Sequence, residues 1–225
     1  MFRNFLLAAI GASILAAGAD SVRAPILVEL FTSEGCSSCP PADRLLESLD
    51  PQVIVLSEHV DYWDRLGWRD PYSAHANTQR QEAYARGFGT QGPYTPQMVI
   101  DGATEFVGND AARAREEIAR ARPRQKVGVH LARTASGVEV RIEPAAKAAE
   151  VWLAVADDSG TSQVTAGENT GRRLHHVAIL RSLRKIGAVK RGTPFELTVE
   201  APAAGRVIVF VQDSGLGRVY GVGSL

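Results

Sequence analysis

Short apolar runs alternate with amphipathic stretches along the first half of the chain. Residues 26–31 and 52–58 are apolar and rich in β-branched side chains, so each run predicts a buried strand. Between them, residues 40–49 place three leucines on one helical face, and their two leading prolines fit only the first turn of a helix. The order strand, helix, strand predicts a βαβ unit with parallel strands.

The pattern of hydrophobic and polar positions is more varied between residues 59 and 121. Residues 59–72 mix four aromatic side chains with charges and follow neither the helical nor the strand period, which indicates an ordered loop. Residues 77–88 predict a polar helix. Residues 95–107 predict a turn, a strand and a hairpin, and residues 110–121 predict a further helix.

Beyond Pro123, hydrophobic residues alternate with polar ones at a period of two, which is typical of half-buried strands. Several short runs of this kind, separated by turns, predict an antiparallel sandwich. The runs are residues 127–131, 138–142, 151–155, 174–180, 195–199, 207–211 and 219–222. We therefore expect an α/β domain at residues 25–124, followed by an all-β, sandwich-like domain at residues 125–225.

The first 19 residues have the layout of a secretory signal peptide. Arg3 supplies a positive charge, residues 5–16 are apolar, and Ala17-Gly18-Ala19 resembles a cleavage site. We expect residues 1–19 to be removed and the protein to be periplasmic or secreted. An uncleaved anchor is the alternative.

The composition adds two expectations about partners. Lys and Arg total 25 and Asp and Glu total 25, so no basic surface for nucleic acid is expected. The 45% of hydrophobic residues is ordinary for a globular protein, and no stable membrane insertion is expected after cleavage.

The chain has two cysteines, Cys36 and Cys39. In an oxidising compartment they are expected to form a disulfide. A ring closed over so few residues restricts the unfolded chain little, so redox chemistry explains the pair better than stabilisation does. Cys36 would lie at a helix N-terminus, where N–H groups favour the thiolate, and is expected to attack, whereas Cys39 resolves the mixed disulfide. The pair itself carries the electrons, so no cofactor and no metal are expected.

Several motifs together resemble a known family. They are ELFTSEGCSSCPPAD at residues 29–43, HVDYWD at residues 59–64, YTPQ at residues 94–97 and GENTGR at residues 167–172. This combination resembles a bacterial family of secreted thioredoxin-like proteins of uncharacterised function. The resemblance implies a thioredoxin-like fold at residues 25–124 and an appended β domain, but it implies no substrate. Thioredoxin has other residues before and between its cysteines, so the direction of electron transfer stays open.

The resemblance also implies that a cis peptide bond before Pro96 lets Thr95 and Pro96 position a substrate. The candidate site wall or tuning residues are Glu34, His59, Asp61, Trp63 and Trp68. For the two tryptophans, a loop that fills its own small core is an equal alternative. For His59, a structural role is the alternative, or metal binding together with the cysteines.

Two further sets of polar residues are expected to be exposed to solvent. Glu34 and Asp43 are near the cysteines and could accept a proton from Cys39, but surface placement is expected for both. The loop around Glu168 and Asn169, which continues to His176, is expected to be solvated, with contact to the domain at residues 25–124 or to a partner as the alternative.

The leading hypothesis is an exported thiol–disulfide oxidoreductase that acts on proteins or small thiols, with a redox partner protein as a further candidate partner. A non-catalytic thioredoxin-like binding module, or a copper or zinc carrier that uses the cysteine pair, is the alternative. A third hypothesis is that the disulfide is purely structural.

Overall fold

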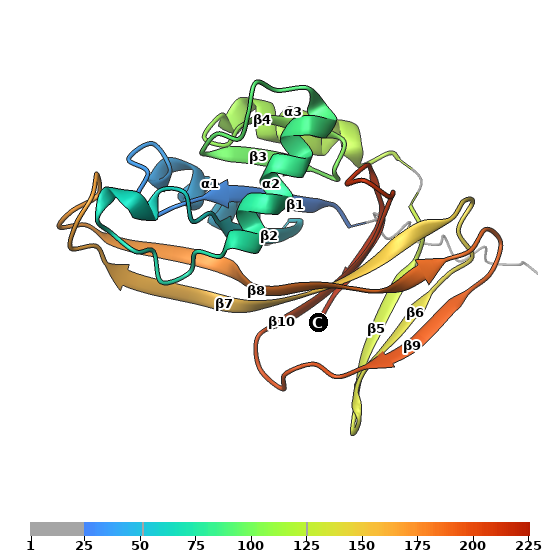
Figure 1. The fold of residues 1–225 in the computed structure, drawn as a ribbon. Helices are drawn as coiled ribbons and strands as arrows, with labels where there is room; N and C mark the ends of the chain where they lie inside the picture. Colours follow the sequence, from blue (N-terminus) through green and yellow to red (C-terminus); the bar gives the residue numbers. More distant parts are fainter. Residues whose placement is uncertain (1–24, 51, 125) are drawn as a thin grey trace, which may run out of the picture.

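The computed structural model describes residues 25–50, 52–124 and 126–225, which form two β-sheets and three α-helices (Figure 1). The larger sheet has eight strands in the order β11-β10-β7-β8-β2-β1-β3-β4, and the smaller has three in the order β5-β6-β9. The strands are β1 (Leu27–Thr32), β2 (Ile54–His59), β3 (Gln97–Ile100), β4 (Thr104–Val107), β5 (Val129–Thr134), β6 (Gly137–Ile142), β7 (Ala149–Gln163), β8 (Arg173–Val189), β9 (Phe195–Val199), β10 (Arg206–Gln212) and β11 (Val219–Ser224). The helices are α1 (Pro40–Leu49), α2 (His75–Phe88) and α3 (Ala111–Ala121), and a short 3-10 helix, η1, spans Asp64–Leu66.

The first elements form where the sequence pattern predicts them. β1 pairs in parallel with β2 and antiparallel with β3, and α1 connects β1 to β2. Val28 and Leu30 pack on the face of the sheet that α1 and α3 cover, whereas Phe31 packs on the other face against Tyr84 of α2. β1 is therefore buried on both sides, which explains its continuous apolar sequence.

The predicted fold class is wrong. The structure is mostly β, and the strands beyond Pro123 do not form a separate all-β unit behind a thioredoxin-like α/β one. β8 pairs in parallel with β2 at Ser57 and Ile179, and β7, β10 and β11 continue the same sheet. Only β5, β6 and β9 form a second sheet, whose core is shared with β7 and β10. The strands themselves were predicted, but their partners were not.

The physical reason lies in β7 and β8. Alternation predicts only the apolar half of each strand, whereas β7 runs over 15 residues and β8 over 17. The two pair along their whole length, from Ala149–Val189 to Gln163–Arg173. One half of the hairpin packs against the smaller sheet, and the other half reaches β2. Burying the backbone edge of β2 requires a partner strand, and no local pattern shows that β8 supplies it.

The large sheet brings distant segments together at one end. The carboxyl ends of β1 and β2, the start of α1 and the turn between β7 and β8 converge there (Figure 1). The two cysteines lie in this region, between β1 and α1.

No helix among the described residues is long and apolar enough to cross a membrane. The predicted signal peptide at residues 1–19 lies outside the described residues.

Candidate functional site

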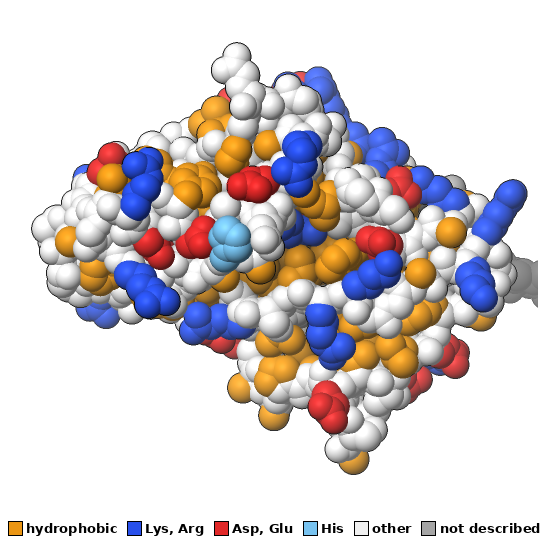
Figure 2. All heavy atoms as spheres, viewed as in Figure 1, with side chains coloured by type: hydrophobic (Ala, Val, Ile, Leu, Met, Phe, Trp, Pro, Cys, Tyr) orange, Lys and Arg blue, Asp and Glu red, His pale blue; other side chains and the backbone are white. Residues whose placement is uncertain are grey.

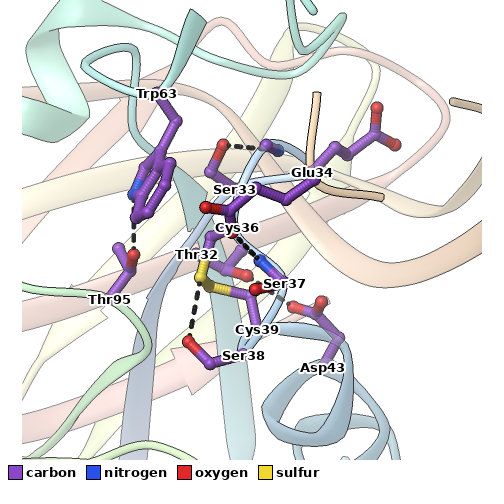
Figure 3. Close-up of a disulfide and its surroundings, with 12 residues drawn as sticks. Thr32, Ser33, Glu34, Cys36, Ser37, Ser38, Cys39, Asp43, Trp63 and Thr95 are labelled. Carbon is purple, nitrogen blue, oxygen red and sulfur yellow. Dashed lines mark hydrogen bonds between the residues drawn. A yellow bond between two sulfur atoms is a disulfide. The ribbon is translucent and has the colours of Figure 1, made fainter. Parts of the chain in front are cut away.

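Cys36 and Cys39 form a disulfide in the turn between β1 and α1 (Figure 3). Their Cα atoms are 5.4 Å apart, and Cys39 is the N-cap residue of α1. Both cysteines are fully buried, with 0% of their surface exposed, whereas Ser37 and Ser38 between them are exposed. The Ser38 hydroxyl lies 3.3 Å from the sulfur of Cys36 and donates to it. A reagent therefore meets the two serines before it meets sulfur.

A buried ionic cluster lies beside the disulfide turn. His176 of β8 lies between two carboxylates, with Nε2 3.2 Å from Glu34 and Nδ1 3.7 Å from Asp43. Burial alone would lower the pKa of His176, but the two carboxylates raise it to about 10. His176 is therefore a cation at neutral pH and compensates the acids. The expectation that Glu34 and Asp43 lie on the surface is wrong, because 0% and 6% of their surface is exposed.

Each acid of the cluster also has neutral donors. The Thr32 hydroxyl donates to Asp43 at 2.8 Å, the indole N–H of Trp68 donates to Glu34 at 2.8 Å, and the Ser162 hydroxyl also donates to Glu34. Buried carboxylates require such partners, because an unpaired buried charge costs several kcal/mol. The cluster is thus assembled from β1, α1, both strands of the β7–β8 hairpin and the loop at residues 60–74 between β2 and α2, which we call the aromatic loop.

His59 belongs to a second buried pair. Its Nδ1 lies 2.7 Å from Asp70, and its ring centre lies 4.5 Å from that of His176. Asp70 also accepts the backbone N–H of Glu34 at 2.8 Å. Burial tends to raise the pKa of Asp70, but His59 and the backbone donors lower it below its ordinary value.

Sequence reasoning overlooked Asp70. Its signal was its place before Pro71 in a turn, where it accepts the N–H of Tyr72 at 2.9 Å, as an aspartate does in an Asx turn. Within the described residues, no group of three His, Cys, Asp or Glu side chains is arranged to hold a metal ion.

The aromatic loop between β2 and α2 covers the disulfide turn. Trp63 lies against Gly35, since a Cβ added at Gly35 would stand 3.0 Å from the Cβ of Trp63. The indole N–H of Trp63 donates to the Thr95 hydroxyl at 2.8 Å (Figure 3). Trp63 and Trp68 thus both contact the residues around the cysteines. Asp61 does not, because it accepts from Thr78 at 2.5 Å and faces the start of α2.

The Thr95–Pro96 peptide bond is cis, as predicted. Thr95 lies on the same side of the disulfide as Trp63 (Figure 3).

The turn between β7 and β8 also holds the disulfide turn. Asn169 is fully buried, and its side-chain amide donates to the carbonyls of Glu34 and Cys36 at 2.8 and 2.9 Å. The exposed Glu168 accepts the backbone N–H of Ser37 at 2.9 Å. We call Glu168 and Asn169 the clasp. The expectation of a solvated loop is wrong for Asn169, and the alternative of contact with residues 25–124 is confirmed.

The charged groups on the opposite face of the sheet do not belong to this site. Arg80 of α2 is buried and donates to Glu29 through Nη2 at 2.5 Å and Nε at 2.8 Å. Burial alone would lower the pKa of Arg80, but Glu29, Tyr84 and Glu58 raise it, and burial raises the pKa of Glu58 well above its ordinary value. These groups stabilise the contact between α2 and the sheet.

A cleft of about 390 Å³ lies between α2 and strands β7 and β8. Figure 2 shows hydrophobic side chains gathered in a hollow on this face, with Lys and Arg side chains along its rim. Trp152 and Leu180 are among the residues that line it, and neither cysteine is. The cleft is therefore separate from the disulfide.

Known proteins match this chain over most of its length. The family described as "Protein of unknown function (DUF1223)" matches residues 27–212. The chain belongs to this family. The predicted membership of an uncharacterised family is confirmed, whereas the thioredoxin-like fold that accompanied this prediction is not. Comparison with curated proteins gives no match.

Two solved structures are similar to this DUF1223 protein. The crystal structure of protein AGR_C_4864 from Agrobacterium tumefaciens has a TM-score of 0.78 and 29% sequence identity, over 89% of this chain and 93% of that chain. HBP35 of Porphyromonas gingivalis has a TM-score of 0.54 and 13% identity, over 90% of this chain and 75% of that chain. At that identity, the second likeness concerns the fold alone.

Proposed function

We propose that this DUF1223 protein is a thiol–disulfide oxidoreductase that exchanges electrons with exported proteins or small thiols through Cys36 and Cys39. The observation that carries the proposal is the disulfide itself, which closes a ring across three residues of sequence separation. Such a ring removes little entropy from the unfolded chain, so it contributes little stability. The disulfide lies at the start of α1, next to the buried cluster of Glu34, Asp43 and His176, and this position supports a chemical role instead.

The exchange proceeds through a mixed disulfide. In the reduced protein, the Cys36 thiolate attacks one sulfur of a substrate disulfide, and the other substrate sulfur leaves as a thiolate that takes a proton from solvent. The Cys39 thiol then loses its proton and attacks the Cys36 sulfur. This restores the Cys36–Cys39 bond and releases the second substrate thiol. Two electrons pass to the substrate, and the reverse sequence oxidises a substrate dithiol. The reduction potential decides which direction prevails.

The burial of both sulfurs means that a neighbouring segment has to move before a substrate sulfur can attack in line. Trp63 and the clasp both contact the disulfide turn, and the Trp63 indole N–H donates to the Thr95 hydroxyl. We propose that displacement of the Trp63 loop opens the turn and that Thr95 and Pro96 then position the substrate. Glu34, His59 and Trp68 set the electrostatic surroundings of the sulfurs. The signal-like residues 1–19 support a periplasmic or secreted location, where such exchange is needed.

The deciding experiment is the equilibrium of the protein without residues 1–19 with glutathione and dithiothreitol. A reduction potential between about −120 and −270 mV is expected for a working exchanger. A bond that resists reduction below about −300 mV would overturn the proposal in favour of a structural bridge.

A matched pair of variants tests the assigned roles. Cys39→Ser is expected to accumulate a mixed disulfide with a model peptide disulfide, because Cys36 attacks but nothing resolves the product. Cys36→Ser is expected to accumulate far less. Equal trapping by both variants would contradict the assignment of Cys36 as the attacking residue.

A further inference from the structure

The clasp places a carboxylate next to the residue proposed to attack. Glu168 is exposed and accepts a hydrogen bond from the backbone N–H of Ser37 at 2.9 Å. That N–H directly follows Cys36. Hydrogen bonds from Ser37 hold the pKa of Glu168 below its ordinary value, so the group is an anion at neutral pH.

Glu168 therefore competes with a thiolate in two ways. It occupies an N–H group at the start of the disulfide turn, where free N–H groups would stabilise a negative sulfur. It also adds a negative charge at short range. Four covalent bonds separate the Ser37 nitrogen from the Cys36 sulfur and span at most about 5 Å, so the nearer Glu168 carboxylate oxygen lies within about 8 Å of that sulfur.

We propose that Glu168 is a positioning residue that destabilises the thiolate form of Cys36 and thereby lowers the rate at which Cys36 reacts at neutral pH. This inference rests on the proposed thiol–disulfide exchange. It assigns the β7–β8 turn, more than 130 residues away in sequence, a role in tuning that site.

The other titratable groups around the turn differ from Glu168 in their surroundings. They are Glu34 of the turn itself, Asp43 of α1, His59 of β2, Asp70 of the aromatic loop and His176 of β8. All five are buried and paired with one another or with neutral donors. The exposed Arg172 follows Glu168 on the same turn, and the exposed Arg173 begins β8. Neither makes a hydrogen bond to Glu168 in the described part of the chain.

The size of the effect follows from distance and screening. A unit charge about 7–8 Å away, in water at low ionic strength, changes an ionisation equilibrium about threefold. In 1 M salt the Debye length falls to about 3 Å, and the effect is expected to vanish. A change that came from altered packing would persist in salt.

The experiment measures how the alkylation rate of Cys36 by iodoacetamide depends on pH in the reduced protein without residues 1–19. At about 10 mM ionic strength, Glu168→Gln is expected to reach a given Cys36 alkylation rate at a lower pH than the wild type does. The hydroxide concentration needed is expected to be about threefold lower. Glu168→Lys, which reverses the charge, is expected to shift it further in the same direction. Both shifts are expected to disappear in 1 M NaCl. Glu139→Gln, on the smaller sheet, is the matched control and is expected to follow the wild type.

The outcomes separate this inference from the proposed function. If dithiothreitol does not reduce the wild-type disulfide, the proposed function fails. If the disulfide is reduced but the wild type, Glu168→Gln and Glu168→Lys coincide at low salt, or if their shifts persist in 1 M NaCl, only the role of Glu168 fails.

Discussion

Replacing His176 by glutamine tests the buried cluster beside the disulfide. The pKa of His176 rises from its ordinary value of 6.5 to about 10 in the folded protein. Because the folded-state pKa lies above the unfolded one, the resulting stabilisation is fully present below pH 6.5 and is lost as the pH rises through 10. Linkage gives about 4 kcal/mol at pH 7 and about 0.4 kcal/mol at pH 10. His176→Gln lacks this contribution and leaves Glu34 and Asp43 without their cation.

The assay is urea unfolding of the oxidised protein between pH 7 and pH 10. From one end of this range to the other, the wild type is expected to lose about 3–4 kcal/mol more of its free energy of unfolding than His176→Gln does. His175→Gln is the matched control, because His175 is the neighbouring residue and 45% of its side chain is exposed. It is expected to follow the wild type. Parallel pH profiles for wild type and His176→Gln would refute the reasoning, because they would show that His176 is uncharged in the folded protein.

Two further predictions concern other buried contacts. Asn169→Ala removes two hydrogen bonds to the disulfide turn and is expected to lower the free energy of unfolding by about 1–3 kcal/mol and to speed reduction by dithiothreitol; equal reduction rates for Asn169→Ala and the exposed control Thr170→Ala would contradict this. Arg80→Met leaves Glu29 buried without its cation and is expected to cost about 3–5 kcal/mol in urea unfolding. Its control Arg86→Met loses an exposed pair and is expected to cost under about 1 kcal/mol, so similar losses in the two variants would refute the reasoning.

The burial of the disulfide bears on how the site is used. Ser37 and Ser38 are exposed while both sulfurs are covered, so direct access to the sulfurs is blocked. Trp63 packs against Gly35 of the turn, and the Asn169 side chain donates to the Cys36 carbonyl. The two segments are more than 100 residues apart, so access to one short motif depends on the packing of the whole chain.

Much of the local structure could be predicted from the sequence because its causes are local. The apolar runs of β1 and β2, the leucine face of α1 and the polar pattern of α2 each specify an element through the side-chain period. The position of the cysteines between a strand and a helix start follows from the same pattern. For that reason, the predicted helix at residues 40–49 coincides with α1.

The sequence by itself thus determined the elements, the cysteine pair and the residues available to surround it. Only the tertiary structure decided that β8 pairs with β2, and this pairing overturned the predicted fold class. The same pairing carries His176 to Glu34 and Asp43 and brings Asn169 to the disulfide turn. Strand pairing and buried charge compensation join residues more than 100 positions apart, and their free energy depends on which groups meet in space. A local pattern of hydrophobic and polar positions therefore cannot predict which distant residues become partners.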